Sequence, residues 1–395
     1  MKSDLVRSRR QATPLWRDER FLRILSQILS AVLVLGALAW TVTNLQAAAE
    51  QRGLALGYDF LSDSAGFPIG ESPIQYDPSA NFLYAFGVGV LNTLKVALVG
   101  IILATILGTL VGLARMSTNW LVSRIALGYI ELHRNIPLLV LLFIWYFSIF
   151  SQLPRVADSI KLPGPIFLNQ RGLYMVRPSL TETGPIWIAS ILIGVILAVI
   201  AFVILRRRRV LTGERTYFAL VSLLLILGIP LIGWFVAGGE PLSYEAPVLD
   251  GFNYQGGLRL TPEYSALLVG LVMYTAAFIA EVVRSGIQAV NVGQVEAARA
   301  VGLKQSHILS LVIIPQALRV IIPPLISQYL NLTKNSSLAL AIGYPDLFTV
   351  GRIMINQAGR AVPVFSMIMG SYLFMSLTTS LLLNIYNRRI QLVER

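Results

Sequence analysis

Residues 284–319 read RSGIQAVNVGQVEAARAVGLKQSHILSLVIIPQALR and connect two apolar stretches. At helical spacing this connection places apolar and polar side chains on opposite sides, which predicts a short amphipathic helix that ends at Gly302. The apolar side holds Ala297, Ala300, Val301 and Leu303, and the polar side holds Glu296, Arg299 and Lys304. Such a helix either lies in the lipid interface or docks into a groove of a soluble partner. The adjacent Ala297 and Ala298 favour docking, because small side chains permit close approach.

The sequence around this connection is too apolar for a soluble protein. Hydrophobic residues make up 55% of the 395 residues and charged residues only 13%, with a mean hydropathy of +0.68, whereas soluble domains are about a quarter charged. A membrane-spanning helix needs about 20 apolar residues. Uncharged runs of suitable length occupy residues 24–49, 96–114, 135–154, 183–205, 216–239, 264–280 and 361–387, and two shorter runs, 305–318 and 320–333, flank Arg319. Taking this pair as one broken span, we expect an all-α, polytopic membrane protein with about eight transmembrane helices.

The distribution of basic residues predicts the orientation. One set of alternate loops (1–23, 114–135, 206–216, 284–308 and 388–395) carries 21 Lys and Arg, and the opposite set carries 9. Cytoplasmic loops are the ones enriched in Lys and Arg. Both termini are therefore expected in the cytoplasm, and the net charge of +12 indicates topology rather than nucleic-acid binding. The run 24–49 is interpreted as an uncleaved span, because it is longer than the apolar region of a signal peptide and follows a polar segment.

Several kinds of chemistry are excluded or disfavoured. The chain has no cysteine, and its two histidines, His133 and His307, are far apart and expected at the surface. We therefore expect no metal site and no catalytic residues. The phosphate-binding pattern G-x-x-x-x-G-K-[ST] is missing, so this chain is not an ATPase, and H-E-x-x-H is missing as well.

The connection between residues 284 and 319 resembles the EAA loop of bacterial ABC importer permeases. Glu296-Ala297-Ala298 is followed by three residues, Gly302, nine residues and then Val312-Ile313-Ile314-Pro315. The family pattern ends in I-x-L-P, so this chain departs from it only by Val and Ile. The resemblance implies a coupling helix that sits in a cleft of an ATPase subunit. The coupling residues that it implies are Gly293, Glu296, Ala297, Ala298, Arg299, Gly302 and Pro315.

Other motifs are similar to polar amino acid permeases of the histidine/glutamine type. They are Gly89-x-x-Asn92-Thr93-Leu94, Glu131-x-x-Arg134-x-Ile136-Pro137, Tyr274-Thr275-Ala276-x-x-Ile279-Ala280-Glu281, Pro315-Gln316-Ala317-Leu318-Arg319 and Lys334-Asn335-Ser336-Ser337-Leu338. The resemblance covers residues 87–152 and 264–387, and it implies the five-helix core of a type I importer with three additional helices. The long form resembles the larger permeases of general L-amino acid import systems.

This resemblance divides the chain into five parts. Residues 1–86 hold the cytoplasmic N-terminus, a first helix at about 24–45 and an outer segment. Residues 87–152 form the first part of the core, with two helices. An insertion, 153–263, holds outer loops and two helices at about 185–205 and 216–237. Residues 264–387 form the second part of the core, with the coupling loop at about 289–308, and 388–395 form a cytoplasmic tail.

The function implied is that of a permease subunit in a binding-protein-dependent ABC importer of amino acids, located in the bacterial inner membrane. Its expected partners are ABC ATPase subunits that bind ATP and Mg²⁺, a second permease in a heterodimer or homodimer, an extracytoplasmic amino-acid-binding protein, the substrate and membrane lipid, with no nucleic acid and no cofactor on this chain. The alternatives are an ion-coupled secondary transporter of small polar solutes, a membrane-embedded enzyme, and a scaffold that docks a partner without transport. Dependence of uptake on ATP distinguishes the first of these.

The broken span at residues 305–333 is the predicted transport site, since short, proline-interrupted segments mark such sites. The 14 residues between Arg319 and Lys334 rise roughly 21 Å, short of the roughly 30 Å hydrocarbon core. Lys334, Asn335, Ser336 and Ser337 then either hold polar groups of an amino acid or extend to the outer headgroups and cap the helix. Tyr274 and Glu281 complete the expected pathway, although Glu281 also has the spacing to pair with Arg284.

Overall fold

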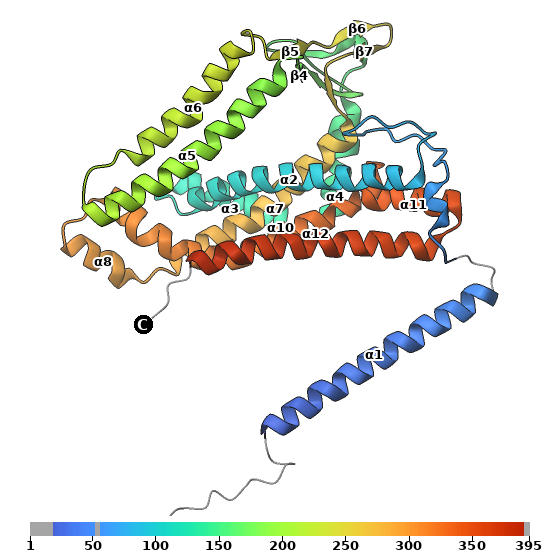
Figure 1. Cartoon of the computed structure of the whole chain (residues 1–395), viewed down its shortest axis with the longest axis horizontal. Coiled ribbons are helices and arrows are strands. Elements are labelled where there is room, and N and C mark those ends of the chain that lie inside the picture. The colour runs from blue at the N-terminus through green and yellow to red at the C-terminus, as the bar shows by residue number, and fades with distance from the viewer. Residues whose placement is uncertain (1–18, 52–55, 391–395) are drawn as a thin grey trace, which may run out of the picture.

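A computed structural model describes residues 19–51 and 56–390, which are mostly helical (Figure 1). The α-helices are α1 (Glu19–Gln51), α2 (Phe82–Arg115), α3 (Trp120–Asn135), α4 (Leu138–Phe143), α5 (Gly184–Thr212), α6 (Phe218–Val236), α7 (Pro262–Gln288), α8 (Val292–Ala300), α9 (Gln305–Ile308), α10 (Ile314–Asn335), α11 (Leu347–Ala358) and α12 (Ala361–Ile390). Short 3-10 helices are η2 (Asp59–Ser62), η4 (Phe150–Gln152), η5 (Val156–Asp158) and η7 (Ser336–Ile342), and π-helices are η3 (Ile144–Ile149) and η6 (Leu309–Ile313). The strands are β1 (Ile160–Leu162), β2 (Ile166–Asn169), β3 (Gly172–Met175), β4 (Arg177–Leu180), β5 (Leu242–Glu245), β6 (Val248–Asp250), β7 (Asn253–Gln255) and β8 (Leu258–Leu260).

The described helices confirm the prediction of about eight spans. Seven segments are long and apolar enough to cross a membrane, and a bent pair, residues 120–135 and 138–152, gives an eighth when taken as one span. The pair is bent by 105°, and the helical part of the run 135–154 begins only after this bend, at Leu138. Pro137 explains the bend, because the residue before a proline is excluded from helical geometry and Ile136 is extended, with ψ at 128°. Residues 114–135, expected to be a loop, contain α3, which Asn119 caps.

The core is built around α7, which packs against α2, α3 and α10. In the apolar window of α7, 61% of the residues are buried, compared with 33% in α2. Small residues allow this packing. A Cβ atom on Gly108 would lie 2.6 Å from Cβ of Ile279, and one on Gly112 would lie 2.7 Å from the Ala280 carbonyl oxygen. Helix α2 therefore approaches α7 backbone to backbone at the Gly108-x-x-x-Gly112 spacing.

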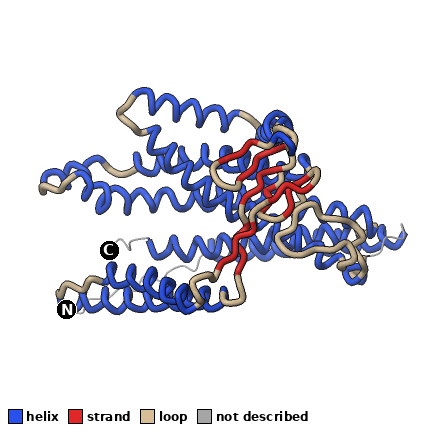
Figure 2. Tube along the Cα trace, turned by 90° about the horizontal axis from the view of Figure 1, so that it is seen from above, coloured by secondary structure: helices blue, strands red, loops and turns tan. Residues whose placement is uncertain are grey.

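The insertion forms a helical hairpin, α5 and α6, joined to the core by strands (Figure 1). Figure 2 shows the strands as a narrow band across the helices. The order β1-β2-β3-β8 makes a four-stranded antiparallel sheet, and β4-β5 and β6-β7 make separate pairs. Strand β8 leads directly into α7. Beside the end of β8, Gly172 of β3 has a φ of +130°, and a Cβ on it would lie 2.2 Å from the Leu260 carbonyl oxygen. The strands were not predicted from the sequence, which indicated only outer loops in this region.

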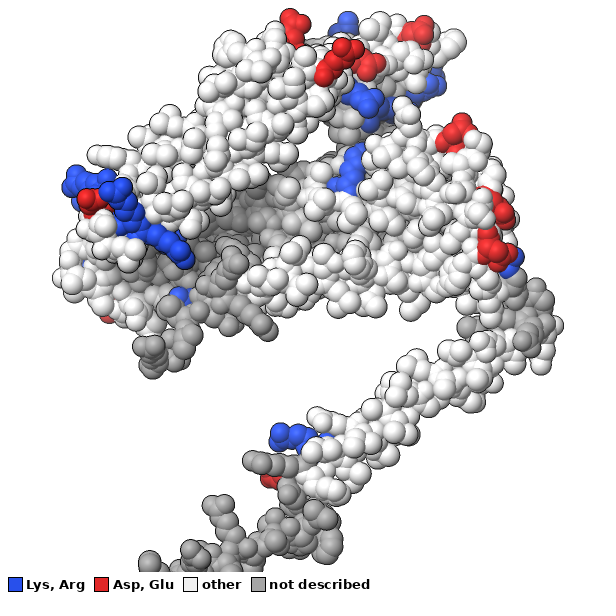
Figure 3. Space-filling view, in the orientation of Figure 1, with Lys and Arg blue, Asp and Glu red and all other residues white. Residues whose placement is uncertain are grey.

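Helix α1 makes no close packing contact within the described part of the chain. Each of its described side chains is exposed, and its apolar window is 0% buried. In the rest of the molecule, charged side chains gather mainly at the ends of the helices (Figure 3). The end of the α5–α6 hairpin carries the exposed basic residues Arg206, Arg207, Arg208, Arg209 and Arg215.

Candidate coupling and transport sites

The predicted amphipathic helix is α8. A side-chain cap marks its start, and a glycine with positive φ follows its end. At its start the side-chain oxygen of Asn291 accepts a hydrogen bond of 2.8 Å from the Gly293 N–H. A Cβ on Gly293 would lie 3.2 Å from that oxygen, which explains a glycine at this position. At its end Gly302 adopts a φ of +78°, a left-handed conformation that glycine adopts without cost. The N–H groups of Gly302 and Leu303 donate to the Arg299 and Ala298 carbonyls.

The outer face of α8 is exposed and built from small, apolar and charged side chains. Val292 is 67% exposed and Val301 79%, and Glu296 and Ala297 lie on the same exposed surface. Ala298 is turned inward and only 5% exposed. Ala297, Ala300 and Val301 of the predicted apolar side are thus exposed, whereas Ala298, which was expected to permit close approach of a partner, faces the rest of the chain. Arg299 and Ala300 are also exposed.

Helix α8 contacts α9 and η6, and the chain connects it to α7 before it and to α10 after it. Helix α7 ends at Gln288, just before α8. Near this end α7 packs closely on α10, because a Cβ on Gly286 would lie 2.2 Å from Cγ1 of Ile321. After α8, the chain continues through α9, where Ile308 is 1% exposed, and through the π-helix η6 into α10. Pro315 lies in the first turn of α10, where a residue without an N–H is tolerated. Helices α7 and α10, which precede and follow α8 in the chain, therefore pack directly against each other.

The predicted pair between Glu281 and Arg284 is present. The Arg284 Nη2 group donates to the Glu281 carboxylate at 2.7 Å, and a second nitrogen of Arg284 donates to Gln288 at 2.6 Å. Tyr274, also in α7, is half-buried, and the centre of its ring lies 5.0 Å from that of Phe278. Glu281 is thus held by its neighbour in the described structure.

The Lys334 group lies where α10 changes to the 3-10 helix η7. Lys334 is exposed and forms no ion pair or side-chain hydrogen bond with any described residue. Ser336 is fully buried and donates to the Thr333 carbonyl at 2.8 Å, and Ser337 donates to the Lys334 carbonyl at 2.8 Å. Asn335 is half-buried. The serines therefore satisfy backbone carbonyls, whereas the lysine ammonium has no partner in the described region.

The six predicted pathway residues do not form one cluster within this chain. Leu332 and Leu268 both face Gly100, so Lys334 lies near the level of Leu268 on α7. Tyr274 and Glu281 lie roughly 9 and 20 Å further along that helix at 1.5 Å per residue. The structure thus spreads the predicted residues along the helices.

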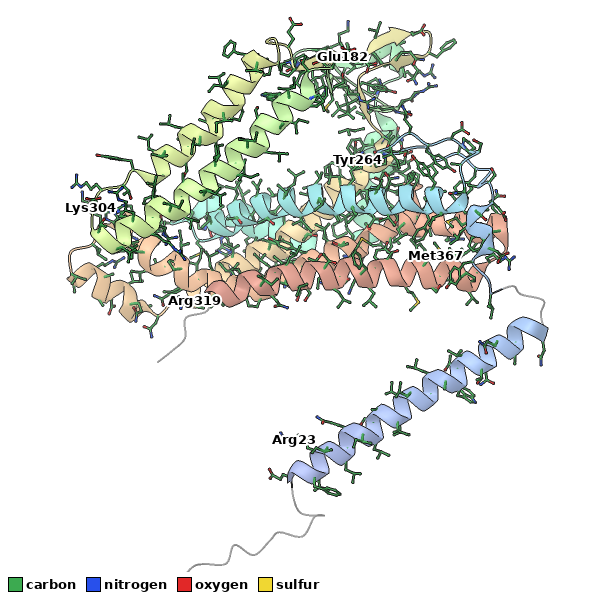
Figure 4. The ribbon with its side chains drawn as sticks, viewed as in Figure 1. Arg23, Glu182, Tyr264, Lys304, Arg319 and Met367 are labelled. Carbon is green, nitrogen blue, oxygen red and sulfur yellow. The ribbon has the colours of Figure 1, made fainter. Side chains whose placement is uncertain are left out.

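A charged cluster that the sequence did not reveal joins three distant segments. The Lys95 ammonium of α2 lies 2.5 Å from the Glu71 carboxylate and 4.2 Å from the centre of the Tyr264 ring, and Thr261 donates to the same carboxylate. Figure 4 places Tyr264 at the opposite end of the core from Lys304 and Arg319. The cluster therefore fixes the segment before α2 to the start of α7.

The two histidines differ in their surroundings. His307 is exposed, as expected. His133 is only 5% exposed, so its predicted surface position is wrong. Its ring packs 4.3 Å from that of Tyr129, and its Nδ1 lies 2.9 Å from the Tyr129 carbonyl oxygen one helical turn earlier. The His133 ring therefore packs along its own helix, α3, against the preceding turn.

Comparison with known proteins agrees with this architecture. The sequence pattern of the family described as "Binding-protein-dependent transport system inner membrane component" matches residues 217–392. The general L-amino acid transport system permease protein AapQ of Rhizobium johnstonii is 43% identical over 382 residues, which are 96% of this chain and 94% of AapQ. The chain belongs to this permease family. The putative amino-acid ABC transporter permease protein YhdX of Escherichia coli is 45% identical, with 94% of each chain covered. The glutamate/glutamine/aspartate/asparagine transport system permease protein BztB of Rhodobacter capsulatus is 38% identical, with 96% of each covered.

Family membership gives the chain its place in the cell and its general role. It is a multi-pass inner membrane permease subunit and not an enzyme, because ATP hydrolysis in these transporters lies in separate subunits. Association with an ATPase, a binding protein and another permease subunit follows for the family. The ion-coupled secondary transporter is correspondingly disfavoured.

Proposed function

We propose that this permease imports amino acids by alternating access, and that α8 is the helix through which it is driven. The names of three relatives similar over nearly the whole chain refer to amino acid transport, which supports the substrate class. The observation that carries the role of α8 is its exposed outer face, capped at both ends and joined to α7 and α10. A groove in an ATPase subunit would receive this face, with Gly293 and Ala297 permitting close approach.

The proposed orientation follows the basic residues. Helix α8 and the arginine-rich end of the α5–α6 hairpin are placed in the cytoplasm, together with both termini. The strands and the Glu71–Lys95 cluster then face the opposite side, where a binding protein delivers its ligand. Two ATPase subunits require two docking helices, so a second permease completes the pore. The long form of the relatives favours a heterodimer.

The substrate pathway is proposed to pass Lys334. Its ammonium has no partner among the described residues and lies where α10 changes to the 3-10 helix η7, which supports contact with an anionic group of the substrate. Asn335 and Ser337 contribute half-buried polar groups at the same level. Tyr274 and Glu281 line the path deeper along α7. The residues that we propose to couple the permease to the ATPase subunit are Gly293, Glu296, Ala297, Ala298, Arg299, Gly302 and Pro315.

Charge substitution on α8 tests this role. Glu296→Lys reverses a charge on the exposed face, and Gly302→Asp strains a left-handed turn. Both variants should insert into the membrane normally and retain ATP hydrolysis by the assembled transporter. They should, however, lose amino acid uptake. Glu214→Lys is the matched control, because it reverses an exposed charge at the same end of the molecule, outside α8, and breaks only a surface pair of 3.1 Å. Normal uptake by both α8 variants would contradict the proposal.

A further inference from the structure

A cavity of about 300 Å³ lies beside the Glu71–Lys95 cluster, at the start of α7. Its volume is at the small end of the range for small-molecule sites. Side chains of Glu71, Arg259, Thr261 and Glu263 line it together with Gly343 and Pro345. These residues come from the segment before α2, from β8, from α7 and from the connection between α10 and α11. The cavity therefore exists only where the insertion meets the core.

Arg259 is exposed, and two contacts orient its guanidinium group. Its Nε donates to the Arg171 carbonyl at 3.0 Å, and its guanidinium lies 5.8 Å from the centre of the Tyr174 ring. No described residue accepts a hydrogen bond from its two terminal nitrogens, and none forms an ion pair with it. A guanidinium fixed in this way presents a planar fork that matches a carboxylate.

Glu263 is positioned in a comparable way. One of its carboxylate oxygens accepts a hydrogen bond of 2.9 Å from the Tyr146 hydroxyl, and the other has no partner among the described residues. Arg259 and Glu263 line the same cavity but form no ion pair within 4.0 Å. Glu71 differs, because Lys95 and Thr261 already satisfy its carboxylate. The cavity thus holds one free cation and one free anion that do not neutralise each other within the described structure.

We propose that this cavity is an outer binding site for the α-ammonium and α-carboxylate groups of a free amino acid. Arg259 receives the carboxylate and Glu263 the ammonium, each through charge-assisted hydrogen bonds. A purely anionic ligand would pair with Arg259 but be repelled by Glu71 and Glu263, and a purely cationic ligand would leave Arg259 unpaired. The groups recognised are those that all amino acids share, so the site admits many side chains. The inference rests on the proposed function and adds a second site at the start of α7, whereas Lys334 lies near the level of Leu268.

The absence of cysteine from the sequence allows a local test. Gly70 is exposed, lines the cavity and has nothing within 4 Å of a built Cβ, so Gly70→Cys introduces one accommodated thiol. The rate at which a membrane-impermeant maleimide labels it is measured on the complete transporter in nanodiscs without binding protein. L-glutamine is added as the probe, and L-glutaminamide and N-acetyl-L-glutamine, which each lack one charge, are the comparison ligands. Gln75→Cys, exposed in the same segment but outside the cavity, is the control.

L-glutamine should slow labelling of Gly70→Cys but not of Gln75→Cys, and each half-charged analogue should protect roughly tenfold less well, since one charged hydrogen-bonded contact is lost. Adding Arg259→Gln should remove the preference for L-glutamine over the amide, and adding Glu263→Gln should remove the preference over the N-acetyl form. Such selective losses separate a ligand contact from a structural role. Labelling indifferent to L-glutamine, or protection unchanged in both double variants, would overturn the proposed site.

The same transporter variants, reconstituted into liposomes with binding protein outside and ATP inside, distinguish this failure from that of the proposed function. Uptake of L-glutamine without protection of Gly70→Cys would overturn the outer site alone. Failure to take up any amino acid would overturn the proposed function itself.

Discussion

The close approach of α2 and α7 makes Gly108→Ala a quantitative test of the fold. A Cβ at this position would lie 2.6 Å from Cβ of Ile279 and 2.8 Å from the Ala276 carbonyl oxygen. Ordinary contact begins near 3.4 Å, so the helices must separate by about 0.8 Å. Neither opposing atom is the end of a flexible side chain. Overpacking of this kind costs about 1–3 kcal/mol, and we expect the free energy of unfolding of Gly108→Ala to fall by that amount.

The matched control lies on the same helix. Gly87 has nothing within 4 Å of a built Cβ, so Gly87→Ala should be neutral or stabilise the helix by about 0.5–1 kcal/mol through reduced backbone freedom. Both variants are unfolded with SDS in mixed micelles, and tryptophan fluorescence reports the transition. If Gly108→Ala proves as stable as Gly87→Ala, the backbone-to-backbone packing of α2 on α7 is refuted.

Three further predictions concern charged residues. Lys95→Met should lower the free energy of unfolding by about 1–3 kcal/mol, because Glu71 is then left largely buried without its cation; adding Glu71→Gln should restore most of the loss in the same SDS titration, and no restoration would refute the pairing. Asp346 caps α11 by accepting a hydrogen bond from the Thr349 N–H, and burial raises the pKa of its carboxyl group. The folded protein therefore binds this proton more tightly than the unfolded chain, and the stability that the proton provides at low pH is lost as pH rises through the raised pKa. Asp346→Asn should keep the cap and remove that pH dependence of the melting temperature, whereas an unchanged pH profile would contradict it. Lys334→Ala should raise the KM for amino acid uptake or change its substrate range, and identical kinetics for a panel of amino acids would remove Lys334 from the pathway.

Sequence reasoning reached most of the helices and the position of α8, since both depend on local patterns. Apolar runs reflect what a lipid environment requires, and glycine at residue 302 terminates α8 with a positive φ as its spacing suggested. The Glu281–Arg284 pair was predictable because three residues separate neighbours on one helical face. In each case the interacting residues are close in sequence.

The features missed depend on contacts between distant segments or on backbone geometry within an apolar run. Glu71 lies 24 residues from Lys95 and 190 from Thr261, and no periodicity connects them. The strands of the insertion are three or four residues long, too short for an alternating pattern to be distinguished from a loop. The bend at Pro137 separates α3 from the helix that begins at Leu138, and an uncharged run does not show how its helix is oriented relative to the helix before it.

Transport by the reconstituted system tests the central claim most directly. Liposomes would contain this chain with its partner permease, ATPase and binding protein, and labelled amino acid would be supplied outside, with or without ATP inside. We predict uptake that requires both ATP and the binding protein. Uptake driven by an ion gradient and indifferent to ATP would contradict the account.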